Sequence, residues 1–359
     1  MGDVSVSIVN WNTRDELCLC LRTVLAQTGV DFDVTVVDNA SSDGSAEMVA
    51  AEFPQTRLIV NKRNLGFGSA HNQVIAATDG RYLFMLNPDA RLEEPDFLKR
   101  IVDFADAHPK AGLIGPKVLN LDGTIQFSAR NFPTVGAAAF QNTFLGRLFP
   151  KSRCVRQYVI SDWDHNEVRE VDWLSGSALM ARRKFIDDAG PLDEDFFIYC
   201  EDVDWGYRAK AKGWKCVYFP GATVVHRIGA SSDHAQVRML WQHHVSMYKL
   251  YRKHQSASLP ERLLVAAGIV ARAGYFIALN RAKAVGKKRE MSNRKRETRN
   301  EERGTSNEKR GSSLPCSISV VGVPELGLGR RPGLLTTLLQ PVNLGAFLAS
   351  GVVHSCSEW

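Results

Sequence analysis

The sequence lacks the features that mark several large classes of protein. Its seven cysteines form no Cys-x-x-Cys pair, and their odd number indicates a reducing compartment. No apolar run is long and uncharged enough to predict a clear membrane-spanning helix, and residues 1–4 do not begin a secretory leader. No Walker-type loop is present. With 44% hydrophobic and 23% charged residues, the 359-residue chain is globular rather than collagenous, coiled-coil or wholly disordered.

Excess charge of one sign is also missing from most of the chain. The net charge is +6, but residues 281–311 hold 12 of the 45 basic and 5 of the 39 acidic residues. The remainder therefore carries 33 basic and 34 acidic side chains. The basic character belongs to one segment, and we expect no nucleic-acid partner.

Short apolar strands alternate with helical segments over the first 115 residues. Strands are predicted at residues 4–10, 34–37, 58–60, 82–86 and 112–114, and helices at 15–26, 45–53, 70–78 and 94–107. Further along, residues 171–181 predict a strand, residues 201–212 a helix, and residues 215–219 and 223–225 short strands. This order predicts an α/β fold with a mainly parallel sheet and helices on both faces.

Polar clusters follow four of these strands, at residues 10–12, 38–43, 64–68 and 87–89. Ligands of such sheets bind at the carboxyl ends of the strands. Four polar loops at one edge therefore predict a single binding site.

Two acidic residues in these loops suit a nucleotide. Asp89, in an Asn-Pro-Asp turn, could hold a hard divalent cation on a diphosphate. Asp38 could accept hydrogen bonds from a base or ribose. The alternatives are a capped turn at Asp89 and a loop cap at Asp38.

A second acidic group, Glu201, Asp202 and Asp204, begins the predicted helix 201–212. One of these carboxylates could act as a general base in a cavity lined by Trp173, Phe197 and Trp205. The alternative is favourable charge at a helix N-terminus. His226 could complete a metal site with Asp89, or could be structural.

The C-terminal third changes character. Residues 263–279 are apolar except for Arg272 and have basic flanks, which favours an interfacial helix on an anionic membrane over a core helix. Residues 286–313 predict disorder, and residues 314–359 show no clear pattern. An aromatic and basic stretch at 127–158 predicts a variable lobe, with Phe127, Arg130, Phe132, Phe140, Phe144, Arg147, Phe149, Arg153, Arg156 and Tyr158.

Seven motifs, taken together, resemble a known family. They are Ser7-Ile8-Val9-Asn10-Trp11-Asn12, residues 36–45, Asn64-Leu65-Gly66-Phe67-Gly68, Leu86-Asn87-Pro88-Asp89, residues 173–177, residues 197–204 and Val225-His226. Over residues 1–255 the chain resembles family 2 glycosyltransferases of the GT-A fold, and within them a rhamnosyltransferase-like branch. The resemblance divides the chain into a GT-A domain (1–255), an amphipathic membrane-associated segment (256–285) and a basic tail without assigned role (286–359).

The resemblance implies a role for each matched residue. Asp202 would be the catalytic base and Glu201 would position the acceptor. Asp89 and His226 would hold Mg²⁺ or Mn²⁺, although Asn87 stands where many relatives have a further Asp. The nucleotide-diphospho-sugar would contact the remaining positions, Asn10, Asp38, Asn64, Gly66 and Asn87.

The implied reaction is a single inverting displacement, with dTDP-L-rhamnose as the first donor expected. The acceptor would be a glycan on a polyprenyl diphosphate, used in cell-surface polysaccharide synthesis by a cytoplasmic enzyme at the inner face of the membrane. A sugar-1-phosphate nucleotidyltransferase would need a Gly-rich basic loop after the first strand, and a processive synthase a Gln-x-x-Arg-Trp motif; both are missing. A non-catalytic carbohydrate-binding relative stays as the alternative.

Overall fold

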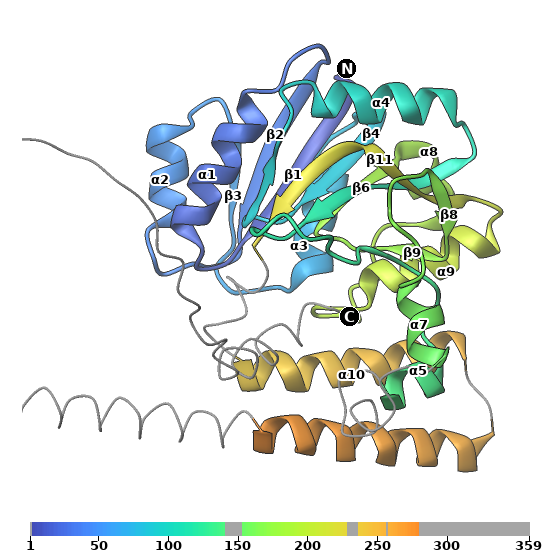
Figure 1. Ribbon diagram of the computed structural model, residues 1–359. Helices are drawn as coiled ribbons and strands as arrows, with labels where there is room; N and C mark the ends of the chain where they lie inside the picture. Colours follow the sequence, from blue (N-terminus) through green and yellow to red (C-terminus); the bar gives the residue numbers. More distant parts are fainter. Residues whose placement is uncertain (1, 141–152, 228–235, 256–257, 280–359) are drawn as a thin grey trace, which may run out of the picture. The chain divides into compact units, whose positions relative to one another are not determined.

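The computed structural model describes residues 2–140, 153–227, 236–255 and 258–279. A mixed sheet runs through them in the strand order β3-β2-β1-β4-β10-β6-β11-β5, with β8 paired to β11 (Figure 1). The strands are β1 (Val4–Asn10), β2 (Phe32–Asp38), β3 (Arg57–Val60), β4 (Tyr82–Leu86), β5 (Ala90–Leu92), β6 (Ala111–Leu119), β7 (Ala129–Arg130), β8 (Arg169–Val171), β9 (Trp173–Leu174), β10 (Ala178–Arg182) and β11 (Lys215–His226).

Helices connect most of these strands. They are α1 (Arg14–Leu25), α2 (Ser45–Glu52), α3 (Phe67–Ala77), α4 (Phe97–Ala107), α5 (Val135–Phe140), α7 (Arg153–Val159), α8 (Arg183–Ala189), α9 (Glu201–Ala211), α10 (Gln236–His254) and a last helix, Leu259–Leu279, without a label in Figure 1.

Both faces of the sheet are covered, as predicted. Along β4, Phe84 faces a core built with α1, α2 and α4, whereas its neighbours Leu83 and Met85 face a second core built with α3, α8 and α9. The strands β1 to β4 are parallel to one another, and β6 is parallel to β11. The expected α/β fold with a mainly parallel sheet is confirmed.

The single strand predicted at 171–181 is wrong. The segment forms β8, β9 and β10, which differ in their partners: β8 pairs with β11, β9 with β7, and β10 lies antiparallel between β4 and β6. Ser175, Gly176 and Ser177 connect the two-stranded sheet of β7 and β9 to β10, and this turn bonds to two other loops of the site. The three-residue strand β5 was not predicted, since it forms only through its pairing with β11.

Residues up to Ile277 belong to one compact unit, which includes α10 and most of the helix Leu259–Leu279. Among the described residues this last helix alone is long and apolar enough to cross a membrane, by length and composition. The tail predicted at 286–359, and Phe144, Arg147 and Phe149 of the predicted lobe, lie outside the described residues.

Candidate active site

The loops after β1, β2 and β3 are joined by side-chain amides. Asn10 Nδ2 donates to Asp38 Oδ2 at 3.1 Å, and Asn39 Nδ2 donates to Asn64 Oδ1 at 3.1 Å. Asn39 Oδ1 accepts the Leu65 N–H at 3.1 Å. These bonds hold the loops together at the carboxyl edge of the sheet, where convergence was predicted.

Gly66 brings one of these loops against the acidic motif. Its φ is +94°, and a Cβ there would collide with the Phe197 carbonyl. The same carbonyl accepts the Phe67 N–H at 2.7 Å. Only glycine fits this close approach, which places the loop after β3 directly on the segment that leads into α9.

Asp89 and His226 meet at the end of β4 and β11. His226 Nδ1 lies 2.7 Å from Gln126 Oε1. Its Nε2 lies 3.1 Å from Asn87 Nδ2 and 3.1 Å from Asp89 Oδ1. An imidazole nitrogen and a carboxylate oxygen therefore face each other, and both side chains are buried.

This pair fits a divalent cation shared with a diphosphate. A nitrogen and an oxygen ligand suit Mn²⁺, whereas Mg²⁺ prefers oxygen alone. Within the described part of the chain no three His, Cys, Asp or Glu side chains cluster as a metal site, so diphosphate oxygens and water would complete the shell.

Asp202 is held by the turn that follows β9. Its Oδ2 accepts the Gly176 N–H at 2.9 Å, and the carbonyl of the next residue, Ser177, accepts the Asn87 N–H at 2.9 Å. One short turn thus connects the carboxylate to the Asn-Pro-Asp loop. Burial raises the pKa of Asp202, although the Gly176 and Val203 amides and Arg130 oppose this.

Glu201 is the more deeply buried of the two acids. Its Oε2 has no hydrogen-bond partner among the described residues. Burial, followed by the Asp202 charge, holds the pKa of Glu201 well above its usual range. Tyr199 and Cys200, just before it, have φ values of +67° and +71°, a strained backbone of the kind that clusters at functional sites.

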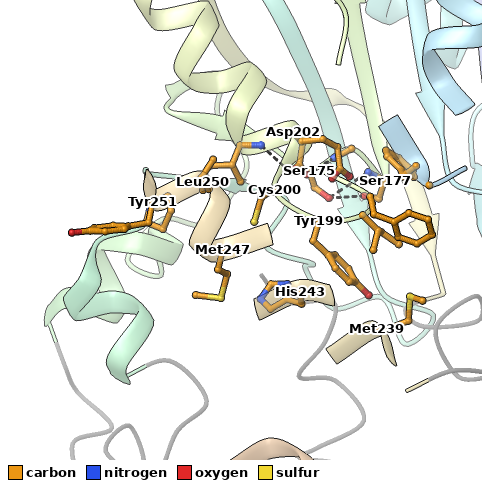
Figure 2. A pocket seen from close by; sticks show the side chains of 18 of the residues that line it. Ser175, Ser177, Tyr199, Cys200, Asp202, Met239, His243, Met247, Leu250 and Tyr251 are labelled. Carbon is orange, nitrogen blue, oxygen red and sulfur yellow. Dashed lines mark hydrogen bonds between the residues drawn. The ribbon is translucent and has the colours of Figure 1, made fainter. Parts of the chain in front are cut away.

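A cavity of about 720 Å³ opens onto these groups. Figure 2 shows Asp202 beside Ser175 and Ser177, with Tyr199, His243 and Met247 also facing the pocket. The cavity brings together most of the predicted site residues: Asn64, Gly66, Asn87, Asp89, Glu201, Asp202 and His226.

Asn10 and Asp38 do not line this cavity. Both are buried, and besides its bond to Asn10, Asp38 accepts the Ser41 N–H at 2.9 Å. In the structure they hold the loop, and the adjacent Asn39 lines the cavity instead. Nucleotide contact by Asn10 and Asp38 stays a prediction.

The aromatic wall predicted around the acids is only partly right. Phe197 lines the cavity, but Trp173 and Trp205 are 1% and 0% exposed and belong to the core. Trp173 packs between α9 and α7, and Trp205 packs on Phe185, so neither ring reaches the acids from the cavity side.

Helix α10 supplies a wall that was not predicted. Its cavity side carries Met239, His243, Met247 and Leu250, whose spacing of three to four residues could have been recognised as a buried helical face. Gln126, which orients His226, had no comparable signal in the sequence.

A buried carboxylate fixes α10 beside the site. Asp204 is fully buried. Its carboxylate oxygens form ion pairs with Arg208 Nε at 2.8 Å, Lys253 Nζ at 2.7 Å and His254 Nε2 at 2.7 Å. Ser246 Oγ also donates to the Ile198 carbonyl at 2.8 Å. The third acid of the motif is therefore an anchor between α9 and α10.

Comparison with known proteins gives family matches that overlap along the chain. The model described as glycosyl transferase family 2 matches residues 5–155, and that of glycosyl transferase family group 2 matches residues 82–256. An N-acetylglucosaminyl-diphospho-decaprenol L-rhamnosyltransferase of Mycobacterium tuberculosis is 34% identical over 260 residues, which cover 69% of this chain and 84% of that protein.

Two further likenesses are weaker. The succinoglycan biosynthesis protein ExoO of Rhizobium meliloti is 28% identical over 239 residues, covering 66% of this chain and 64% of that protein. Among solved structures, TarS 1–349 of S. aureus is 16% identical with a TM-score of 0.48, covering 75% of this chain and 70% of that one.

Proposed function

Because the chain belongs to glycosyl transferase family 2 and is a glycosyltransferase, we propose that it moves L-rhamnose from dTDP-L-rhamnose to a lipid-linked glycan. The mycobacterial relative is named for L-rhamnose transfer to N-acetylglucosaminyl-diphospho-decaprenol. An acceptor of that kind would place the product in cell-wall polysaccharide synthesis.

Asp202 is the general base in this proposal. Its carboxylate removes the proton from the acceptor hydroxyl as that oxygen attacks the anomeric carbon. The nucleoside diphosphate leaves from the opposite face of the sugar, so the configuration inverts. The leaving diphosphate needs no protonation, and one protein carboxylate suffices, unlike the pair that glycoside hydrolysis uses.

The donor diphosphate is assigned to the Asp89 and His226 end of the cavity. Mn²⁺ or Mg²⁺ held by these two side chains would neutralise the charge that develops on the leaving group. Asn87 Nδ2 lies 3.1 Å from His226 Nε2, and the Asn87 backbone N–H donates to the Ser177 carbonyl. The neutral Asn87 leaves the site one charge short of a two-aspartate motif, which favours weak rather than strict metal dependence.

One observation carries the assignment. The turn Ser175-Gly176-Ser177 binds the Asp202 carboxylate through one amide and the Asn87 amide through one carbonyl. Base and diphosphate site therefore share a short, rigid connection and open into one cavity. Displacement requires both at the same anomeric carbon, in near-attack geometry. A non-catalytic relative would have no need of this connection.

A position at the inner face of the membrane is part of the proposal. Leu259, Leu263 and Val270 of the last helix are 68%, 62% and 58% exposed, and Trp241 of α10 is 49% exposed. Exposed apolar residues with a tryptophan suit the membrane interface.

A panel of dTDP-, UDP- and GDP-sugars tests the donor. We expect dTDP-L-rhamnose to raise the melting temperature, more with Mn²⁺ than without, and Asp89→Ala to abolish the metal-dependent part. Asp122→Ala, in an exposed turn, is the matched control. A folded protein that no nucleotide sugar stabilises would contradict the transferase proposal.

A further inference from the structure

The cavity extends well beyond the groups that the reaction needs. It is also lined by α10 and the helix Leu259–Leu279, whose lining side chains are mostly apolar, with His243 and Arg272 among the polar ones and Gln255 just past α10. The apolar lining there includes Met239, Met247 and Leu250 of α10 and Leu264, Val265 and Ile269 of the last helix. A nucleotide sugar is polar along most of its length, so an arm with so many apolar side chains suits another occupant.

Arg272 lines the same arm. Its Nη1 donates to His244 Nε2 at 3.1 Å and approaches Met247 Sδ at 3.6 Å, and its guanidinium lies 5.0 Å from the Phe276 ring centre. His244 Nδ1 donates to the Leu240 carbonyl, and burial lowers the pKa of His244 to about 4. These partners orient the guanidinium within the arm.

We propose that the apolar arm binds the polyprenyl chain of a lipid diphosphate, with Arg272 on the diphosphate. This rests on the proposed function, since the sugar on such a lipid would be the acceptor. The arm is continuous with the cavity that holds Asp202, so a sugar at Asp202 places its diphosphate and chain in the arm. The planar guanidinium suits diphosphate oxygens, and thioether and branched side chains adapt to isoprene units.

The last helix also explains how the chain could enter. Val265 and Ile269 line the arm, whereas Leu263 and Val270 on the same helix are exposed at 62% and 58%. Leu264 lines the arm and is itself 74% exposed, so the lining of the arm is continuous with the surface proposed to meet the bilayer. A lipid tail can pass along this helix without crossing a polar surface.

Two glycines of the last helix give a matched test. Gly268 lines the arm and Gly274 does not, and an added Cβ meets open space at both positions. Gly268→Phe would fill the arm, whereas Gly274→Phe changes the same helix elsewhere. Both replace a helical glycine by a better helix former, so folding should not suffer.

The measurement is titration calorimetry of the full chain with farnesyl diphosphate, at a saturating concentration of the nucleotide that binds best, which blocks the donor site. We expect Gly268→Phe to weaken binding by about tenfold or more and Gly274→Phe to leave it unchanged. Arg272→Gln should weaken the binding of farnesyl diphosphate about tenfold, because charge-assisted bonds to the diphosphate are lost. It should change the binding of farnesol little, since farnesol has no diphosphate. Arg262→Gln is the control for Arg272.

Each contrary result removes a defined part of the proposal. If Gly268→Phe and Gly274→Phe bind farnesyl diphosphate equally well, or if the wild type does not bind it, the proposal that the arm holds a polyprenyl chain is overturned. Farnesol and palmitate binding as tightly as farnesyl diphosphate, with no effect of Arg272→Gln, overturns the diphosphate assignment. If no nucleotide binds, the donor proposal fails, and farnesyl diphosphate titrated alone with the same variants still decides the arm.

Discussion

At the scale of single residues, the site depends on how two adjacent acids are charged. Asp202 keeps amide and Arg130 interactions that favour its ionised form, whereas Glu201 Oε2 has no partner among the described residues. Both pKa values are raised by burial, Glu201 well above its usual range. Environment therefore gives two neighbouring carboxylates different roles, one poised as a base and the other held back from ionisation.

Arg130→Gln tests whether the Arg130 charge lowers the pKa of Asp202. The base must be ionised, so kcat/KM falls as pH falls through the pKa of Asp202. Removing the Arg130 charge raises that pKa further, and the acid limb of the pH profile should move to higher pH. Arg130→Lys keeps the charge and should leave the limb in place. An identical limb in both variants would show that Arg130 has no influence on the base.

Glu201→Gln tests how much the buried Glu201 carboxyl group lowers the stability of the folded protein at neutral pH. Because its pKa is raised in the folded protein, the folded state binds more protons than the unfolded one, and stability falls as pH rises above the usual range of a glutamate. At neutral pH the glutamine side chain should raise the melting temperature, by about 2–4 °C for each kcal/mol gained in the free energy of unfolding. The gain should vanish near pH 4, where both states are protonated. Exposed Glu167→Gln should show no gain at either pH.

At the scale of elements, the position of α10 depends on Asp204. Its fully buried carboxylate is bonded by Arg208, His254 and the partly exposed Lys253, so Asp204→Asn weakens three contacts that hold the two helices together. We expect a loss of about 1.5–3 kcal/mol in the free energy of unfolding by urea. Asp103→Asn, which breaks the exposed pair with Lys99, should cost about 0.5 kcal/mol or less. Similar losses for the two would contradict the anchor.

The sequence was most informative where a local pattern determines the element. The buried strands β1, β2 and β4 are runs rich in apolar and β-branched residues that end in polar loops, and they were predicted within a few residues. By contrast, β5 has three residues and pairs only with β11, and the turn 175–177, which leads from β9 into β10, bonds Asp202 and Asn87. Such features depend on contacts between distant segments, which no local pattern shows.

At the scale of the whole molecule, two truncations separate the proposed parts. A protein ending at residue 290 should keep donor binding and transfer, because the predicted roles all lie before it. A protein ending at residue 257 loses the helix Leu259–Leu279 and should keep donor binding but lose transfer to a lipid-linked acceptor. Melting temperatures with the donor and product formation check both. Loss of transfer in the longer protein, or full transfer in the shorter one, would contradict this division.

The central claim is that Asp202 removes the acceptor proton while the rest of the cavity binds the donor. Its most direct test is transfer from dTDP-L-rhamnose to N-acetylglucosaminyl-diphospho-polyprenol, followed by mass spectrometry. The wild type should form the disaccharide lipid. Asp202→Asn should be about 10²–10⁴-fold slower with unchanged donor affinity. Transfer at the wild-type rate by Asp202→Asn would contradict the claim.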